Sequence, residues 1–255
     1  MIKAAFFDVD GTLLSFKTHR VPASTERALE AMRERGIKTV ISTGRPVYQM
    51  PEFLLDGFDA YITLSGQYCF DADGVYRSQP IDDADVRAVV EQVDAGVYDS
   101  LCMQGEDSFV NEFSPRVLAA AKNAGLTYRK DDFHKAFDAP VYQFCAFVPP
   151  EDDHIVHEVT SNIITTRWCD IFCDIVPAAG GKDFGVRATL ERMGIAPEEA
   201  IAFGDGENDL SMFGAVGTSV AMGNAWGGTK DAATFVTTDV DHDGVWNACE
   251  HFDLI

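Results

Sequence analysis

Hydrophobic residues in the first part of the chain form short runs that alternate with longer amphipathic stretches. Three apolar runs of strand length are Ala4 to Phe7, Ile37 to Ser42 and Ala60 to Leu64. The segment Ser24 to Arg35 has helical spacing, and Gly36 is a typical residue to end a helix. This strand, helix and strand order predicts a parallel sheet.

The same alternation returns near the end of the chain. A helix is predicted over Lys182 to Met193, and short strands are predicted over Ala200 to Phe203, Thr218 to Met222 and Phe235 to Thr237. We therefore expect both ends of the chain to build one parallel sheet, with ligands at the carboxyl ends of its strands. A hairpin is expected between Tyr68 to Asp71 and Val75 to Arg77.

The residues between these halves, 81–179, carry an alternation of their own. Helices are predicted near Asp83 to Val93, Pro115 to Ala124 and Glu151 to Ser161, and strands near Ser100 to Met103, Ser108 to Val110, Val141 to Phe147 and Trp168 to Val176. An insert of this size can fold as a second α/β unit and cover a site.

Two carboxylates follow the first predicted strand, in Phe6-Phe7-Asp8-Val9-Asp10-Gly11-Thr12. Strand periodicity points Asp8 and Asp10 to the same side, and Gly11 allows the backbone to leave the sheet in a tight turn. One carboxylate can attack a phosphorus atom while the other handles protons. An ordinary acidic turn would look the same, so the interpretation depends on the rest of the chain.

Three further segments support phosphate chemistry. In Ser42-Thr43-Gly44-Arg45 a hydroxyl, backbone amides and a guanidinium follow the second strand. Lys182 opens a predicted helix, so its ammonium and the positive end of that helix could meet an anion. A third strand ends in Gly204-Asp205-Gly206-Glu207-Asn208-Asp209. Each residue alone could instead have a purely structural role, such as ending a strand, being a solvated lysine or placing a charge at a helix start. The pattern of all three segments together supports a phosphate site.

Taken in order, these four segments resemble the haloacid dehalogenase (HAD) superfamily of phosphohydrolases, over nearly the whole chain. The large insert is similar to the α/β cap of the Cof-type branch. The resemblance implies an α/β fold with a Rossmann-like core of residues 1–80 and 180–255 and an inserted cap of residues 81–179. One departure is Ser65-Gly66-Gln67, where many relatives have Asn-Gly-Ala.

The residues and the resemblance agree on a metal. An ionised Asp8 would repel a phosphate monoester unless a cation neutralised both. A set of oxygen ligands suits Mg²⁺: the Asp8 and Asp205 carboxylates and a main-chain carbonyl, that of Asp10. Asp209 is expected to bind the metal or to orient its waters.

The expected reaction is hydrolysis of a small phosphorylated metabolite. Asp8 would attack phosphorus to give an aspartyl-phosphate, and Asp10 would protonate the leaving group and then activate water. The expected phosphate contacts are Thr43, Gly44, Arg45, Lys182 and Asn208. The resemblance implies sugar phosphates as substrates, with nucleotide or cofactor phosphates as alternatives.

Three other functions remain open from the sequence. A phosphotransferase or phosphomutase would pass the same aspartyl-phosphate to a second substrate. A binding protein with a decayed site is disfavoured because the set of acidic residues and Lys182 is intact. Residues Asp239 to Glu250 match the spacing of a calcium-binding EF-hand loop, but residues 233–238 resemble a strand and not the helix that such a loop needs.

Composition and charge limit the classes of binding partner that the chain could have. The 255 residues carry a net charge of −21 without a basic stripe, which disfavours nucleic acid and anionic membranes as partners. No apolar run is long enough to span a bilayer, and the first strand begins too early for a secretory signal, so a cytoplasmic location is expected. The six cysteines are scattered and are expected to be neither disulfide-bonded nor zinc-bound.

Overall fold

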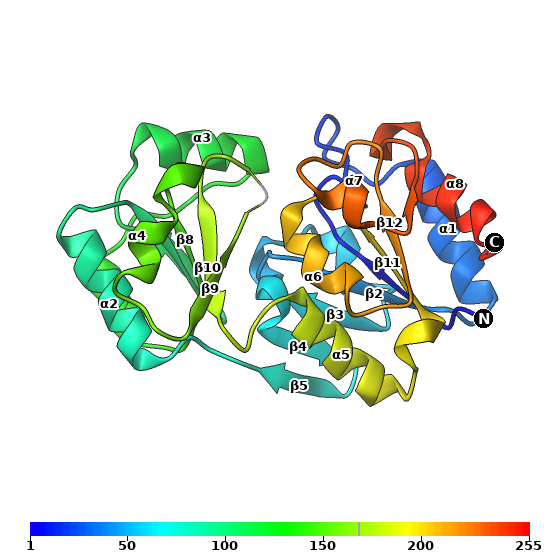
Figure 1. The fold of residues 1–255 in the computed structure, drawn as a ribbon, viewed down its shortest axis with the longest axis horizontal. Coiled ribbons are helices and arrows are strands. Elements are labelled where there is room, and N and C mark those ends of the chain that lie inside the picture. The colour runs from blue at the N-terminus through cyan, green and yellow to red at the C-terminus, as the bar shows by residue number, and fades with distance from the viewer. Residues whose placement is uncertain (168) are drawn as a thin grey trace. The chain divides into compact units, whose positions relative to one another are not determined.

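The computed structural model describes residues 1–167 and 169–255 (Figure 1). Two compact units divide the chain. The first comprises Met1–Gly44, Pro51–Arg77 and Gly181–Ile255, and the second comprises Arg45–Met50 and Ser78–Gly180. The segment Arg45–Met50, expected in the core, therefore groups with the inserted residues. Within the described residues, no helix has the length and apolar character needed to cross a membrane.

The first unit is built on an eight-stranded sheet in the order β13-β12-β11-β1-β2-β3-β4-β5. The strands from β13 to β3 are parallel neighbours, and β4 runs antiparallel to β3. The strands are β1 (Ala4–Phe7), β2 (Lys38–Ser42), β3 (Ala60–Thr63), β4 (Tyr68–Asp71), β5 (Gly74–Ser78), β11 (Ala200–Gly204), β12 (Thr218–Ala221) and β13 (Phe235–Val236). The predicted α/β fold with a parallel sheet is confirmed.

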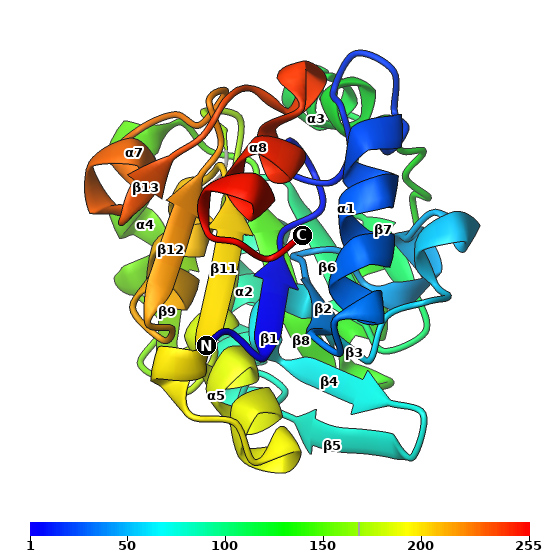
Figure 2. The ribbon, with the colours of Figure 1, turned by 90° about the vertical axis from the view of Figure 1, so that its right-hand side faces the viewer.

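Helices cover both faces of this sheet (Figure 2). They are α1 (Ala23–Glu34), α5 (Lys182–Met193), α6 (Leu210–Phe213), α7 (Thr229–Ala232) and α8 (Gly244–His251). On one face, Val186 and Leu190 of α5 belong to a buried apolar cluster with Phe6 and Ile62. On the other face α1 and α8 lie side by side (Figures 1 and 2). The alternation of side chains along each strand supplies both apolar faces.

The second unit has a five-stranded sheet in the order β7-β6-β8-β10-β9, with antiparallel neighbours throughout. Its elements are α2 (Asp83–Asp94), β6 (Ser100–Gln104), β7 (Ser108–Val110), α3 (Pro115–Ala124), β8 (Val141–Ala146), α4 (His154–His157), β9 (Ile163–Thr166) and β10 (Cys173–Pro177). Val86, Val89 and Val90 of α2 join Phe144 and Ile175 of the sheet in one apolar core.

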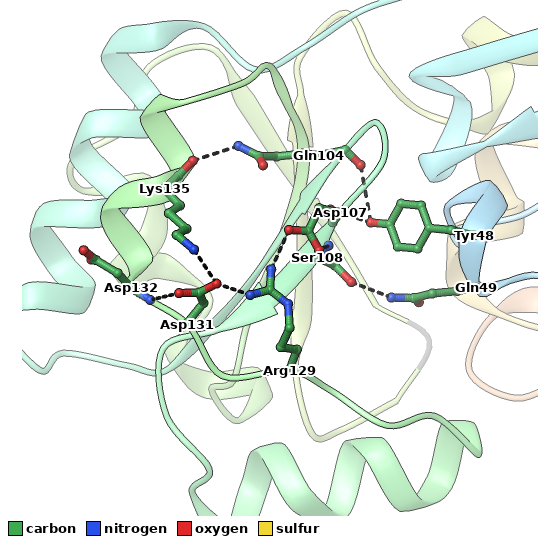
Figure 3. A network of polar contacts seen from close by, with 9 residues as sticks. All are labelled: Tyr48, Gln49, Gln104, Asp107, Ser108, Arg129, Asp131, Asp132 and Lys135. Atoms are coloured by element: carbon green, nitrogen blue, oxygen red, sulfur yellow. Dashed lines mark hydrogen bonds and ion pairs between the residues drawn. The ribbon is translucent and has the colours of Figure 1, made fainter.

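Hydrogen bonds explain why Arg45–Met50 belongs to the second unit (Figure 3). The Tyr48 hydroxyl donates to the carbonyl oxygens of Asp107 at 2.6 Å and Gln104 at 3.3 Å. The Gln49 amide donates to the Ser108 hydroxyl at 2.9 Å. These contacts join the segment to the turn between β6 and β7, and a sequence pattern cannot reveal them because their partners lie more than fifty residues away.

Two predicted elements of the second unit differ from the structure, and one strand was missed. The helix expected over Glu151 to Ser161 is only the short α4, after a 3₁₀ turn at Pro150–Asp152. Strand β9 was not predicted. The strand expected from Trp168 begins at Cys173, and Trp168 itself lies outside the described residues.

The buried Arg167 binds the backbone just before β10. Its guanidinium donates to the carbonyl oxygens of Phe172 at 2.8 Å and Val148 at 3.0 Å. It also pairs with the carboxylate of Asp153. The carbonyl oxygen of Phe172 is therefore bound by a side chain, and strand β10 begins at the next residue.

The packing of α5 on β3 gives a test of the first unit. A Cβ on Gly185 would lie 2.4 Å from Cγ2 of Ile62, so we expect Gly185→Ala to destabilise the protein by about 1–3 kcal/mol. This outweighs the gain of roughly 0.5–1 kcal/mol that alanine usually brings to a helix interior. Urea unfolding measures the difference. Gly214→Ala is the control, since its nearest neighbour would be 3.5 Å away, and equal stability of the two variants would contradict the tight packing.

Candidate active site

The predicted site residues of the first unit lie at one edge of its sheet. Asp8 directly follows β1, Thr43 follows β2 and Asp205 follows β11. Strand β1 lies between β2 and β11, and all three strands are parallel, so their carboxyl ends meet. This is the position at which open α/β sheets bind ligands.

Three carboxylates converge at this edge. Asp8, Asp205 and Asp209 are buried, and each offers an oxygen within 4.8 Å of the other two. In the described part of the chain, this is the one group of three or more acidic, histidine or cysteine side chains with such spacing. The side chain of Asp10 is not in the group, and Asp10 itself is half-buried.

A buried lysine ties two of these carboxylates together. Nζ of Lys182 lies 2.5 Å from Oδ1 of Asp8 and 2.6 Å from Oδ1 of Asp209. The other oxygen of Asp209 accepts hydrogen bonds from the backbone N–H groups of Asp205 at 2.9 Å and Gly206 at 3.1 Å. Asp209 therefore orders both the loop after β11 and the lysine.

The electrostatics of this cluster favour a cation. Burial raises the pKa of Asp8 to about 7; Lys182 opposes the rise, and Asp209 and Asp10 add to it. Burial and the charges of Asp8 and Asp209 also raise the pKa of Asp205 well above its usual value. For Lys182, burial works against the ammonium, but Asp209 and Asp8 outweigh it and raise the pKa. Carboxylate oxygens in this number suit a hard divalent cation, which would relieve their repulsion.

Gly11 and Asn224 both contact Asp205 and shape the cluster, and Asn224 was not predicted from the sequence. Gly11 has φ of +87°, and a Cβ there would lie 2.1 Å from Oδ2 of Asp205. The Asn224 amide donates to the carbonyl oxygen of Gly11 at 2.8 Å and to Oδ2 of Asp205 at 3.2 Å. Its Oδ1 accepts from the N–H of Val240 at 2.9 Å. The sequence feature that could have indicated Asn224 is its position just after β12, at the same edge of the sheet.

The remaining predicted phosphate contacts lie in different surroundings. Thr43 is buried, its N–H donates to the carbonyl oxygen of Ile62 at 2.8 Å, and Gly44 follows it. Arg45 groups with the second unit, where its guanidinium donates to the carbonyl oxygens of Gln49 at 3.0 Å and Ala124 at 3.3 Å. Asn208 is half-buried in a 3₁₀ turn, Glu207–Asp209.

The EF-hand alternative is wrong in this structure. A strand, β13, precedes the segment, and α8 begins at Gly244, the sixth residue of the supposed loop. The Asp239 carboxylate accepts a hydrogen bond from the N–H of Asp241 at 2.8 Å, and the Asp241 carboxylate pairs with Lys17 at 2.7 Å. A loop that turns helical at its midpoint cannot wrap around an ion.

Comparisons with known proteins agree with this geometry. A family model described as haloacid dehalogenase-like hydrolase matches residues 5–249. The chain is 29% identical to the YkrA protein of Bacillus subtilis (strain 168), over 99% of this chain and 98% of that protein. It is 30% identical to the HMP-PP phosphatase of Klebsiella pneumoniae (strain 342), over 88% of this chain and 85% of that protein.

Solved structures give the same result. A structure described as the HAD subclass IIB sugar phosphatase BT4131 superposes with a TM-score of 0.90 at 32% sequence identity. The match covers 99% of this chain and all of the other. The resemblance inferred from the four sequence segments is confirmed, including its Cof-type branch, subclass IIB.

The role of Asn224 leads to a prediction about stability. Asn224→Ala leaves three backbone or carboxylate partners without their hydrogen bonds, so we expect a loss of about 1–3 kcal/mol in the free energy of unfolding. Urea unfolding measures it. Asn123→Ala, at an exposed position of α3, is the control and should change stability by less than about 0.5 kcal/mol. Similar values for both variants would show that Asn224 does not hold this loop.

Proposed function

This chain belongs to the haloacid dehalogenase-like hydrolase family, and we propose that it is a Mg²⁺-dependent phosphatase of small phosphate monoesters that works through an aspartyl-phosphate. The observation that supports this most directly is the buried ammonium of Lys182 between Asp8 and Asp209, beside Asp205. Such a site has a nucleophile, a fixed positive charge and a set of oxygen ligands for a metal.

Asp8 is the proposed nucleophile. It follows a central strand, and its Oδ1 is held 2.5 Å from the Lys182 ammonium, so its orientation is fixed before substrate arrives. Mg²⁺ held by the carboxylates of Asp8 and Asp205, the Asp10 carbonyl and, directly or through water, Asp209 would offset their negative charge and that of the phosphate. Attack of an Asp8 oxygen on phosphorus forms the acyl phosphate and expels the alcohol oxygen.

Asp10 is the proposed acid and base. It stands two residues beyond Asp8, after the end of β1, and unlike Asp8 it is only half-buried. As a carboxylic acid it would give its proton to the leaving alkoxide. As a carboxylate it would then take a proton from the water that hydrolyses the acyl phosphate, which returns both residues to their starting state.

Lys182 and Thr43 are the proposed contacts to the transferring phosphoryl group. A fixed ammonium and a buried hydroxyl would stabilise the charge on its equatorial oxygens. The backbone of Gly44 would add an N–H donor. Arg45 and Asn208 stay predictions as phosphate contacts.

Sugar phosphates are the substrate class to test first. The structurally similar BT4131 is described as a sugar phosphatase, and the similar protein of K. pneumoniae is named HMP-PP phosphatase. The expected partner is a small phosphorylated metabolite in the cytoplasm. A phosphotransferase or phosphomutase remains the alternative, because the same acyl phosphate can pass to an alcohol instead of water.

The first test is release of inorganic phosphate from a panel of sugar, nucleotide and cofactor phosphates with Mg²⁺. We expect release that EDTA abolishes and that Asp8→Asn reduces to background, because an amide cannot act as the nucleophile. The variant should stay folded, because asparagine has nearly the size of aspartate and its amide oxygen can still accept a hydrogen bond from Lys182. Release by Asp8→Asn equal to wild type would refute the covalent mechanism. Phosphate recovered on an added sugar instead of in solution would establish transfer.

The role of Asp10 is tested with leaving groups of different basicity. We expect Asp10→Asn to slow hydrolysis of an alkyl phosphate by about 10²–10⁴-fold. For an aryl phosphate with an acidic leaving group, the rate of the first step, formation of the acyl phosphate, should fall less. Its leaving oxygen departs without needing a proton. Rates of single-turnover release measure this step. Equal losses for the two substrates would contradict the acid role.

A further inference from the structure

The turn that follows β3 has an unusual backbone. Leu64, Ser65 and Gly66 have φ of +52°, +55° and +94° in succession, and two of these are not glycine. Left-handed conformations cost free energy for residues with a side chain, and such strain persists only where the surroundings enforce it. This turn contains the Ser65-Gly66-Gln67 sequence in which the chain departs from the Asn-Gly-Ala of many relatives.

On one side the turn holds the loop that contains Thr43. The N–H of Ser65 donates to the carbonyl oxygen of Thr43 at 3.0 Å. The hydroxyl of Ser65 also lies close to Gly44, the residue after Thr43: a Cβ on Gly44 would be 3.3 Å from the Ser65 oxygen. The main chain at the proposed phosphate-binding threonine is therefore fixed by this turn.

On the other side the turn holds the start of α5, which contains Lys182. Oε1 of Gln67 accepts a hydrogen bond from the N–H of Gly181 at 3.2 Å, and the Gln67 side chain is completely buried. The two backbones are in close contact, because a Cβ on Gly66 would lie 2.1 Å from the carbonyl oxygen of Gly181. Gly181 directly precedes Lys182 and has no side chain of its own to cap the helix.

The buried amide of Gln67 is oriented by this one bond. Nε2 finds no acceptor among the described residues, whereas Oε1 faces the N–H of Gly181. Exchanging the two atoms would point an NH₂ group at another donor, so the orientation is determined. A buried polar group with half of its capacity unused is unfavourable compared with an apolar side chain of similar size. Packing alone therefore does not explain a glutamine here.

We propose that Gln67 is a positioning residue for catalysis: through the N–H of Gly181 it sets the place of Lys182, while Ser65 sets that of Thr43. The turn Leu64–Gln67 thus fixes the spacing between the two groups that contact the phosphoryl oxygens. The inference rests on the proposed phosphatase function, since it assigns a role to Lys182 in that reaction. Small displacements of such groups have large effects on rate.

The test compares two variants of nearly equal size in the full-length protein. Gln67→Met fills the same space but cannot accept a hydrogen bond from Gly181. Gln67→Glu retains a carboxyl oxygen that can accept it in either protonation state. Both are assayed for kcat/KM with Mg²⁺ on the best substrate of the phosphate panel, beside wild type and Asp8→Asn, and their melting temperatures are measured.

We expect Gln67→Met to lower kcat/KM by roughly tenfold or more at nearly unchanged melting temperature, and Gln67→Glu to recover most of that loss. Gln67→Met with wild-type kcat/KM would overturn the inference. The inference would also be overturned if kcat/KM fell in both variants in proportion to their melting temperatures, because activity would then depend on packing. If wild type released no phosphate, the proposed function would fail; Asp8-dependent release with no effect at Gln67 would refute the positioning role alone.

Discussion

The ion pairs of Lys182 with Asp8 and Asp209 are the interaction on which the site depends. Three buried carboxylates at one sheet edge repel one another, and removal from water makes each charge more costly. The ammonium stands between two of them, at 2.5 and 2.6 Å. With all groups ionised, two negative charges remain, which a divalent cation would balance. Burial is the main reason that the pKa of Asp8 and that of Asp205 are raised, and repulsion from the neighbouring carboxylates adds to the rise.

The fold serves this arrangement through close backbone approaches. A Cβ on Gly11 would lie 2.1 Å from Asp205, and one on Gly204 would lie 2.5 Å from Asp209. At Gly185, α5 lies so close to the Ile62 side chain of β3 that a Cβ on the glycine would be only 2.4 Å from it. Each glycine removes the atom that would push an acidic side chain or the lysine-bearing helix away. The glycines in the acidic motifs are therefore part of the geometry that brings the charges together.

Much of this could be predicted because it is local. Periodicity located β1, α3 and α5 at their observed bounds and placed Asp8 and Asp205 at strand ends, and parallel pairing then brings those ends together. The errors have distant causes. Arg45 belongs to the second unit through residues such as Ala124, and Asn224 acts on Gly11, more than two hundred residues away. The guanidinium of Arg167 binds the carbonyl oxygen of Phe172, just before β10, and a periodicity of apolar residues does not reveal such a side-chain contact.

The strong negative charge of the chain makes the local arrangement more important. A net charge of −21 opposes the approach of a phosphate, but salt confines the repulsion to roughly 8 Å from each exposed charge at physiological ionic strength. Within that distance of the site, the charges at the sheet edge determine whether a phosphate is attracted or repelled. There the buried Lys182 is screened little and cannot swing away, because Asp8 and Asp209 hold it and Gly181 fixes its backbone. A surface lysine would lack this constraint, so attraction in this acidic protein depends on a cation that is positioned before the substrate binds.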